Sequence, residues 1–250
     1  SFAYGAPGTQ RIEQNLKILF PEAKILRMDS DSARQRDTYK SMYNRMKNRE
    51  VDILLGTQMI SKGLDFPLVT LVGIVMADIS LNLPDFRAAE RTFQLLTQVA
   101  GRSGRRNKTG DVIIQTYNPQ HYAIESASQQ NYIRFATEEL GYRKKLYYPP
   151  YYRLARILFQ STDLETLKKE IINVKEVLYI LHKQFPAPQL FLLGPSTAPF
   201  SKISSYYRYH LIFKAQTVKV LQGAIKLFNS VYNCPFNIRK QIDIDPNNLM

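Results

Sequence analysis

Four short apolar runs, rich in β-branched residues, recur through the first 120 residues and predict the strands of a sheet buried on both faces. They cover 23–28, 51–55, 69–76 and 110–116. Between them, apolar positions at helical spacing predict helices at 9–20, 33–49 and 88–102. This alternation of strands and helices predicts an α/β fold with a parallel sheet and covering helices. Polar residues follow the runs, at the carboxyl ends of the predicted strands, where ligands bind in such sheets.

A second pattern begins after Tyr147-Tyr148-Pro149-Pro150, which we interpret as a domain boundary. Residues 118–146 before it predict one or two connecting helices. The predicted order beyond it is strand, helix, two strands, helix and strand, at 152–160, 164–183, 189–193, 206–214, 217–229 and 237–244. This is the split β-α-β-β-α-β order of ferredoxin-like α+β domains. The sequence therefore predicts two domains, 1–146 and 147–250.

Composition indicates a globular, water-soluble chain, because 44% of the 250 residues are apolar and 22% are charged. No apolar run approaches the roughly 20 residues of a membrane span, and the start of the chain lacks the pattern of a signal peptide. With Cys234 as the single cysteine, neither a disulfide framework nor a cysteine-built zinc site can form within the chain. The three histidines are too scattered to predict a metal site. These features fit a cytoplasmic location with no membrane partner.

The net charge of +13 suggests a polyanionic partner. Residues 1–150 hold 21 lysines and arginines against 15 acids, and residues 151–250 hold 13 against 6. The excess is therefore spread over both halves and is denser in the second. Charge that serves only solubility is the alternative explanation.

Three polar side chains at the end of the third predicted helix share one face. Gln98 and Arg102 are four residues apart, and Arg102 and Arg105 are three apart. Two guanidiniums on one face suit a phosphate, because each presents a rigid fork of donors. The alternative is a basic helix end that complements the helix dipole.

Longer segments carry a family resemblance. The segments GTQMISKGLDFPLVTLV and PDFRAAERTFQLLTQVAGRSGR, within 56–105, resemble motifs V and VI of superfamily 2 helicases, and more closely those of the PriA family of replication-restart DNA helicases. GTQRIE at 8–13 is similar to a helix start of that family, with Gln10 where glutamate is usual. YPPYYRLARI at 148–157 and IDIDP at 242–246 also match.

The resemblance implies that 1–146 is the second RecA-like lobe of a helicase motor, incomplete at its N-terminus, with connector helices. It implies that Arg102 and Arg105 reach the ATP phosphates and that Gln98 couples nucleotide to DNA. Gly63 and Asp65 fall in a motif that senses the nucleotide. For Asp65, a salt bridge or a loop cap is the alternative.

DNA contacts are expected in both domains. Thr57 and Gln58 match positions that touch the DNA backbone in the family. In the second domain, residues 200–210 interleave aromatic and basic side chains, a pattern that can stack bases and neutralise phosphates. The resemblance implies fork contact there, and we expect Lys202, Tyr207 and Arg208 to make it. A strand whose tyrosines alternate between core and surface explains the same pattern.

Two signatures of a complete motor are missing from the sequence. It contains no G-x-x-x-x-G-K-[ST] phosphate loop and no Asp-Glu-x-His box. ATP and Mg would therefore need a first lobe to complete their site, and the cysteines that bind zinc in the family are also absent. We expect this chain alone neither to hydrolyse ATP nor to unwind DNA.

Taken together, the resemblance implies the C-terminal part of an ATP-dependent 3′–5′ DNA helicase that recognises stalled replication forks and restarts replication by primosome assembly. It implies single-stranded-DNA-binding protein and primosome proteins as partners. One alternative is a non-catalytic DNA-fork-binding module or degenerate homologue. Another is a fragment of an RNA helicase of the same superfamily, although YPPYYRLARI and IDIDP favour the PriA family.

Overall fold

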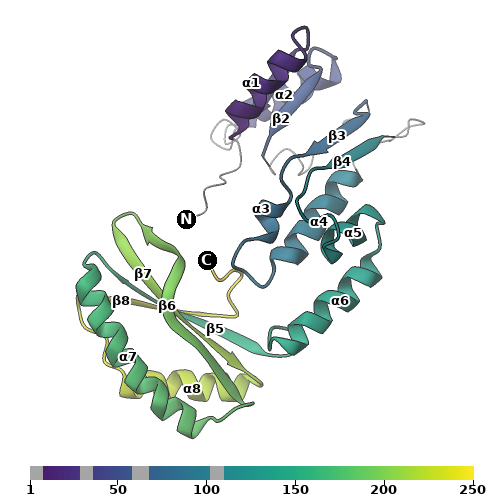
Figure 1. Ribbon diagram of the computed structural model, residues 1–250. Helices are drawn as coiled ribbons and strands as arrows, with labels where there is room; N and C mark the ends of the chain where they lie inside the picture. The colour runs from purple at the N-terminus through teal and green to yellow at the C-terminus, as the bar shows by residue number, and fades with distance from the viewer. Residues whose placement is uncertain (1–7, 29–35, 58–67, 102–109) are drawn as a thin grey trace. The chain divides into compact units, whose positions relative to one another are not determined.

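The computed structural model describes residues 8–28, 36–57, 68–101 and 110–250 (Figure 1). Contacts between Cα atoms divide the chain into two compact units. Unit 1 comprises Ser1–Leu83 and Ala89–Phe135, and unit 2 comprises Pro84–Ala88 and Ala136–Met250. Within the described residues, no helix is long and apolar enough to cross a membrane.

The first half of unit 1 pairs two short parallel strands. Its elements are α1 (Thr9–Leu19), β1 (Ile25–Met28), α2 (Arg36–Lys47) and β2 (Ile53–Gly56). The register runs from Ile25 opposite Ile53 to Met28 opposite Gly56. Met28 and Met42 are buried together, with Leu54 packed against them. The strand-helix-strand order of the sequence therefore forms a parallel pair with α2 packed against it.

The second half of unit 1 contains another parallel pair. Its elements are β3 (Leu71–Ile74), α3 (Asp78–Leu81), α4 (Ala88–Ala100), β4 (Asp111–Ile114), α5 (Tyr122–Ser128) and α6 (Tyr132–Lys145), whose last ten residues belong to unit 2. Leu71 pairs with Asp111 and Ile74 with Ile114. Phe93 of α4 stacks on Phe135 of α6, with ring centroids 4.2 Å apart, at the centre of the core.

The predicted α/β class and parallel pairing are confirmed, but the described strands of unit 1 form two separate two-stranded sheets where one sheet was predicted. The strands are also shorter than the apolar runs. The run 69–76 yields a strand only from Leu71 to Ile74, and Met76 adopts a φ of 56°. An extended strand cannot contain a left-handed residue, so the backbone turns there although the sequence remains apolar.

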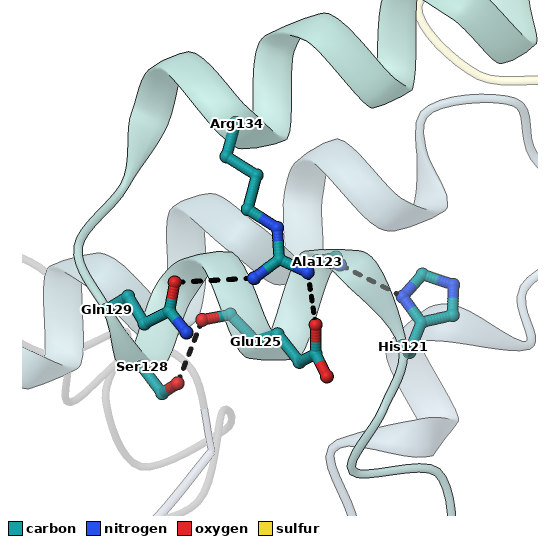
Figure 2. A network of polar contacts seen from close by, with 6 residues as sticks. All are labelled: His121, Ala123, Glu125, Ser128, Gln129 and Arg134. Carbon is teal, nitrogen blue, oxygen red and sulfur yellow. Dashed lines mark hydrogen bonds and ion pairs between the residues drawn. The ribbon is translucent and has the colours of Figure 1, made fainter.

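Polar contacts join α5 to α6, the two helices found where one or two were predicted. Figure 2 shows Arg134 of α6 reaching back to α5, where it pairs with Glu125 and donates to Gln129 at 3.3 Å. At the start of α5, Nδ1 of His121 accepts a hydrogen bond from the Ala123 amide at 3.2 Å. These contacts hold the helical connector in a tight turn.

Unit 2 is a four-stranded antiparallel sheet in the order β6-β7-β5-β8. Its elements are β5 (Arg153–Ser161), α7 (Leu164–Gln184), β6 (Leu190–Ile203), β7 (Tyr206–Ala215), α8 (Val218–Val231) and β8 (Arg239–Ile244). Both helices pack on one face of the sheet (Figure 1). The predicted ferredoxin-like order is confirmed, and the predicted apolar stripe of α7 lies in the core.

The β6–β7 hairpin is much longer than predicted, because the expected strand 189–193 continues to Ile203. Pro195 and Pro199 make this stretch resemble a loop, yet β6 is an edge strand, where proline is tolerated. Irregular register after Leu193 and after Thr197 absorbs the prolines. Ser204 and Ser205 close the hairpin with φ of 46° and 74°, the left-handed conformations of a two-residue hairpin turn.

Candidate nucleotide and nucleic-acid sites

Most residues predicted to contact or sense the nucleotide lie outside the described part of the chain, namely Gly63, Asp65, Arg102 and Arg105. Gln58, a predicted DNA contact, lies outside it as well. Gln98 is exposed in the last turn of α4, which ends at Ala100. Thr57 is exposed directly after β2. The shared face of Gln98, Arg102 and Arg105 therefore stays a prediction.

Asp78, which follows β3, has a structural role that the sequence interpretation missed. Its carboxylate accepts hydrogen bonds from the Thr116 hydroxyl at 2.9 Å and the Tyr117 amide at 3.0 Å, just beyond β4. Burial opposes ionisation, but these bonds outweigh it and hold the pKa of Asp78 below its usual value. The carboxylate thus ties together the ends of two parallel strands. In the sequence, the only indication of this structural role was the position of a carboxylate directly after an apolar run.

At the tip of the β6–β7 hairpin, two of the predicted DNA contacts lie together. Lys202 is directly opposite Tyr207 in the strand register. Its ammonium lies 4.5 Å from the centre of the tyrosine ring, and Nζ donates to the hydroxyl at 3.3 Å. Phe200 and Ile203 nearby are exposed. The Tyr207 ring itself is half-buried against the core, so the tip presents a cation and apolar surface beside a partly exposed aromatic ring.

Arg208, the third predicted contact, lies on the opposite face of the sheet from Tyr207, because successive residues of a strand alternate. Its side chain is only 6% exposed, and Nη1 donates to the Phe200 carbonyl at 3.3 Å. Burial, and then the positive charge of Arg156, lower the pKa of Arg208. The structure thus places Arg208 in a separate environment from Lys202 and Tyr207.

Arg239 of β8 was missed by the sequence interpretation. Its guanidinium carbon lies 4.4 Å from the centre of the Tyr206 ring, which is on the same strand as Arg208. More than 30 residues separate Arg239 from Tyr206 in sequence, and β5 lies between their strands. No local pattern predicts such a pair.

The segment Pro84–Ala88, which leads into α4, is bound within unit 2. Phe86 stacks on Tyr148, with ring centroids 5.0 Å apart and an interplanar angle of 6°. The buried Asp85 carboxylate accepts from the Arg87 amide at 2.8 Å and from the Leu249 amide at 3.3 Å. The sequence predicts that Asp85, Arg87, Glu90 and Arg91 form a structural ion network around the start of the helix. The side chain of Arg87 also donates to the Asn247 carbonyl at 2.9 Å, so Asp85 and Arg87 both contact backbone groups of the last residues. The ion network itself stays a prediction.

Lys214 is a buried cation beside this segment. Its side chain is 5% exposed, Nζ donates to the Leu146 carbonyl at 2.8 Å, and the ammonium lies 3.5 Å from the centre of the Tyr148 ring. Burial lowers the pKa of Lys214 to about 8. The carbonyl and the ring favour the charged form, so they limit that fall.

We expect the stability of unit 2 to rise between pH 8 and pH 10 because of Lys214. In this window the unfolded chain, with a lysine pKa near 10.5, binds a proton that the folded state has released, so folding becomes more favourable as pH rises. Relative to Lys214→Met, the free energy of unfolding of the unchanged protein should rise by roughly 1 to 3 kcal/mol across this pH range. Urea unfolding at several pH values measures this difference. Parallel pH profiles of the two proteins would contradict the assignment.

The comparisons with known proteins agree with this two-part architecture. Residues 6–107 match the helicase conserved C-terminal domain, and residues 144–247 match the primosomal protein N C-terminal domain. The chain thus joins part of a helicase to a domain of a replication-restart protein. It belongs to the PriA family of replication-restart proteins.

Individual relatives match along nearly the whole chain. The replication restart protein PriA of Bacillus subtilis is 39% identical over 246 residues, covering 97% of this chain and 30% of that protein. The PriA of Treponema pallidum is 38% identical over 250 residues, covering 99% of this chain and 37% of that protein. The chain therefore spans about a third of the length of the curated relatives it matches.

Proposed function

We propose that this chain is the C-terminal portion of an ATP-dependent 3′–5′ DNA helicase that recognises stalled replication forks and restarts replication by primosome assembly. The observation that carries the proposal is the succession, in one chain, of a helicase C-terminal domain and the C-terminal domain of primosomal protein N. Helicase motors bind ATP between two lobes. This chain would supply the second.

In this proposal, Arg102 and Arg105 stabilise negative charge on the ATP phosphates, and Gly63, Asp65 and Gln98 respond to the nucleotide. ATP and Mg would be held mainly by a first lobe, because the sequence has no phosphate-binding loop. Of these residues, only Gln98 is described, and its exposure at the end of α4 is compatible with the role.

The cysteines that bind zinc in the family are absent from this sequence. Cys234 is the single cysteine, its sulfur donates to the Ile238 carbonyl at 3.4 Å, and burial raises its pKa. A raised pKa disfavours the thiolate that zinc requires. Among the described residues, no group of three or more His, Cys, Asp or Glu could hold a metal.

Forked or single-stranded DNA is the proposed partner, contacted by Thr57, Gln58, Lys202, Tyr207 and Arg208. The net charge of +13 and the cation–aromatic pair at the hairpin tip support this assignment. Single-stranded-DNA-binding protein and primosome proteins are proposed partners on the family resemblance alone. We further propose a domain boundary at 146/147, which lies between the unit boundary at 135/136 and the start of β5.

A non-catalytic fork-binding module remains a second candidate function, because the sequence lacks the phosphate-binding loop. The ATPase rate of the chain, with and without forked DNA, tests both. We expect no turnover above that of Arg105→Ala, because an arginine without a nucleotide cradle cannot catalyse hydrolysis.

Adding a separately produced first lobe distinguishes the two candidates. Turnover that appears on mixing and is lost in Arg105→Ala would support the half-site assignment. Absence of turnover in a mixture shown to associate would favour the non-catalytic module. Turnover by the chain alone, lost in the variant, would contradict the proposed half-site.

A further inference from the structure

The sheet of unit 2 carries an excess of cations on the face that its helices do not cover. Alternation along the strands, combined with their register, identifies the side chains on this face of β5, β7 and β8. The ionisable side chains there are Arg156, Arg208, His210, Lys214, Arg239, Tyr206 and Asp243. Asp243 is the single carboxylate of that set, so the face is strongly positive.

Three of these side chains lie close together. Arg208 and His210 are two residues apart on β7, and Arg156 on β5 is diagonal to His210, whose direct partner is Leu158. Side chains in diagonal positions of a sheet are within reach of one another when they are long. The pKa of His210 is consistent with this proximity. Burial lowers that pKa most, and the positive charges of Arg156 and Arg208 lower it further.

In the cluster formed by Arg156, Arg208 and His210, the two arginines are buried and His210 is half-buried, and the hydrogen-bonding capacity of the three side chains is only partly used. Arg156 is 9% exposed and Arg208 is 6% exposed. Nε of each arginine and Nδ1 of His210 are buried, with no hydrogen-bond partner among the described residues. Arg156 donates to the main-chain oxygen of Met250 and lies 3.5 Å from the Asp243 carboxylate, whereas Arg208 has no acid partner among the described residues.

Burial of these positive charges destabilises the folded state unless a bound anion neutralises them. A buried charge without a partner costs several kcal/mol, and two neighbouring guanidiniums add mutual repulsion. The Phe200 carbonyl accepts a hydrogen bond from Arg208 but cannot neutralise its charge. The geometry therefore fits an anion with several acceptor oxygens better than it fits a dry structural core.

The neighbours of the cluster favour a nucleic-acid phosphate over a carboxylate. Tyr206 lies on the same face of β7 as Arg208, two residues earlier, and carries the guanidinium of Arg239 on its ring. Aromatic rings beside cations are the arrangement on which bases of a single strand stack while their phosphates are neutralised. A planar guanidinium also matches two phosphate oxygens at once.

We propose that Arg156, Arg208 and His210 bind one backbone phosphate of single-stranded DNA on the face of the unit 2 sheet that its helices do not cover, with Tyr206 beside it for a base. The proposal rests on the proposed function, because it assumes that the chain binds DNA. It places Arg208, one of the proposed DNA contacts, in a site separate from Lys202 and Tyr207, which lie across the sheet.

The first experiment uses inorganic phosphate as the probe and thermal unfolding as the measurement. Phosphate should raise the melting temperature of the unchanged chain above its value in chloride at equal ionic strength, since a ligand of the folded state stabilises it. The increment should be lost in Arg208→Gln and kept in Lys175→Gln, which removes an exposed lysine on α7. Equal increments in all three proteins would overturn the site.

A second measurement needs no variant. NMR titration of the His210 imidazole should show its depressed pKa rising when phosphate is added, because a nearby anion favours the protonated ring. An unchanged pKa at saturating phosphate would count against the cluster even if Arg208→Gln failed to fold.

A third experiment measures binding of a short oligothymidylate at several salt concentrations. Arg208→Gln should lower the slope of log affinity against log salt by roughly 0.7, the value for one phosphate of a single strand. Lys175→Gln should leave the slope unchanged. Retained DNA binding with an unchanged slope in Arg208→Gln would overturn this site and remove Arg208 from the proposed DNA contacts, but the proposed helicase function of the chain would stand. Absence of DNA binding by the unchanged chain would overturn both.

An acidic peptide provides the remaining comparison. If it bound the unchanged chain but not Arg208→Gln, while the slopes for DNA were equal, the cluster would be a carboxylate site and the phosphate assignment would be wrong. If inorganic phosphate competed with the oligonucleotide for the unchanged chain but not for Arg208→Gln, the phosphate assignment would be supported.

Discussion

Binding of forked DNA to this chain is expected to weaken by about three orders of magnitude between 50 and 200 mM salt, if at least six phosphates are contacted. The reason is counterion release, because each neutralised phosphate frees a condensed cation and adds roughly 0.9 to the log–log slope for duplex DNA. The net charge of +13, spread over both halves of the chain, provides enough cations for such contacts. Fluorescence anisotropy of a labelled fork across a salt series measures the slope.

Lys202→Ala tests the contribution of the hairpin tip. We expect it to reduce the slope by somewhat less than one unit, because one phosphate contact is lost. Lys175→Ala on α7 is the matched control and should leave the slope as it is. A flat salt response of the unchanged protein would contradict phosphate contacts altogether. An equal reduction in both variants would show that Lys202 acts only through net charge.

Replacing Phe213 with alanine is expected to destabilise unit 2 by about 3–5 kcal/mol. Phe213 is fully buried between the sheet and α8, where its ring meets Phe228 edge-on at a centroid distance of 6.0 Å. Truncation removes apolar contact and leaves a cavity that close-packed neighbours cannot fill. Because domains are stable by only 5–15 kcal/mol, a large share of the stability would be lost.

Hydrogen exchange of the β5 amides measures this loss within unit 2 alone. Protection of this central strand should fall by roughly 100- to 3,000-fold, at 1.4 kcal/mol for each factor of ten. Phe236→Ala is the control, because Phe236 is fully exposed and its truncation should change stability by less than about 0.5 kcal/mol. Similar losses of protection in both variants would contradict the assigned core.

The sequence predicted the elements of unit 2 well because their signals are local. The stripe from Leu167 to Leu181 has helical spacing, and Asp163 and Thr217 cap α7 and α8 with their side chains. Where the prediction was wrong, tertiary context had changed the meaning of a local signal. Pro195 and Pro199 indicate a loop by themselves, but at the edge of a sheet they are compatible with a strand.

The candidate sites were less predictable. The aromatic-basic stretch 200–210 was recognised as a unit, yet side chains alternate along β7, so Tyr207 and Arg208 lie on opposite faces of the sheet. The cluster of Arg156, Arg208 and His210 joins two strands separated by about 50 residues, so no spacing rule predicts it. Asp78 shows the same limit, since its partners, Thr116 and Tyr117, are nearly 40 residues away.

By itself, the sequence determined the class of each half, the order of strands and helices, the basic charge and the family resemblance. These depend on short-range periodicity, on composition and on contiguous motifs, all of which are present before the chain folds. Only the tertiary structure decided which cations are buried, which aromatic rings they meet and how Pro84–Ala88 is held by Tyr148 and Leu249. Burial and charge pairing depend on residues brought together from distant parts of the chain, and strand order and register decide those contacts.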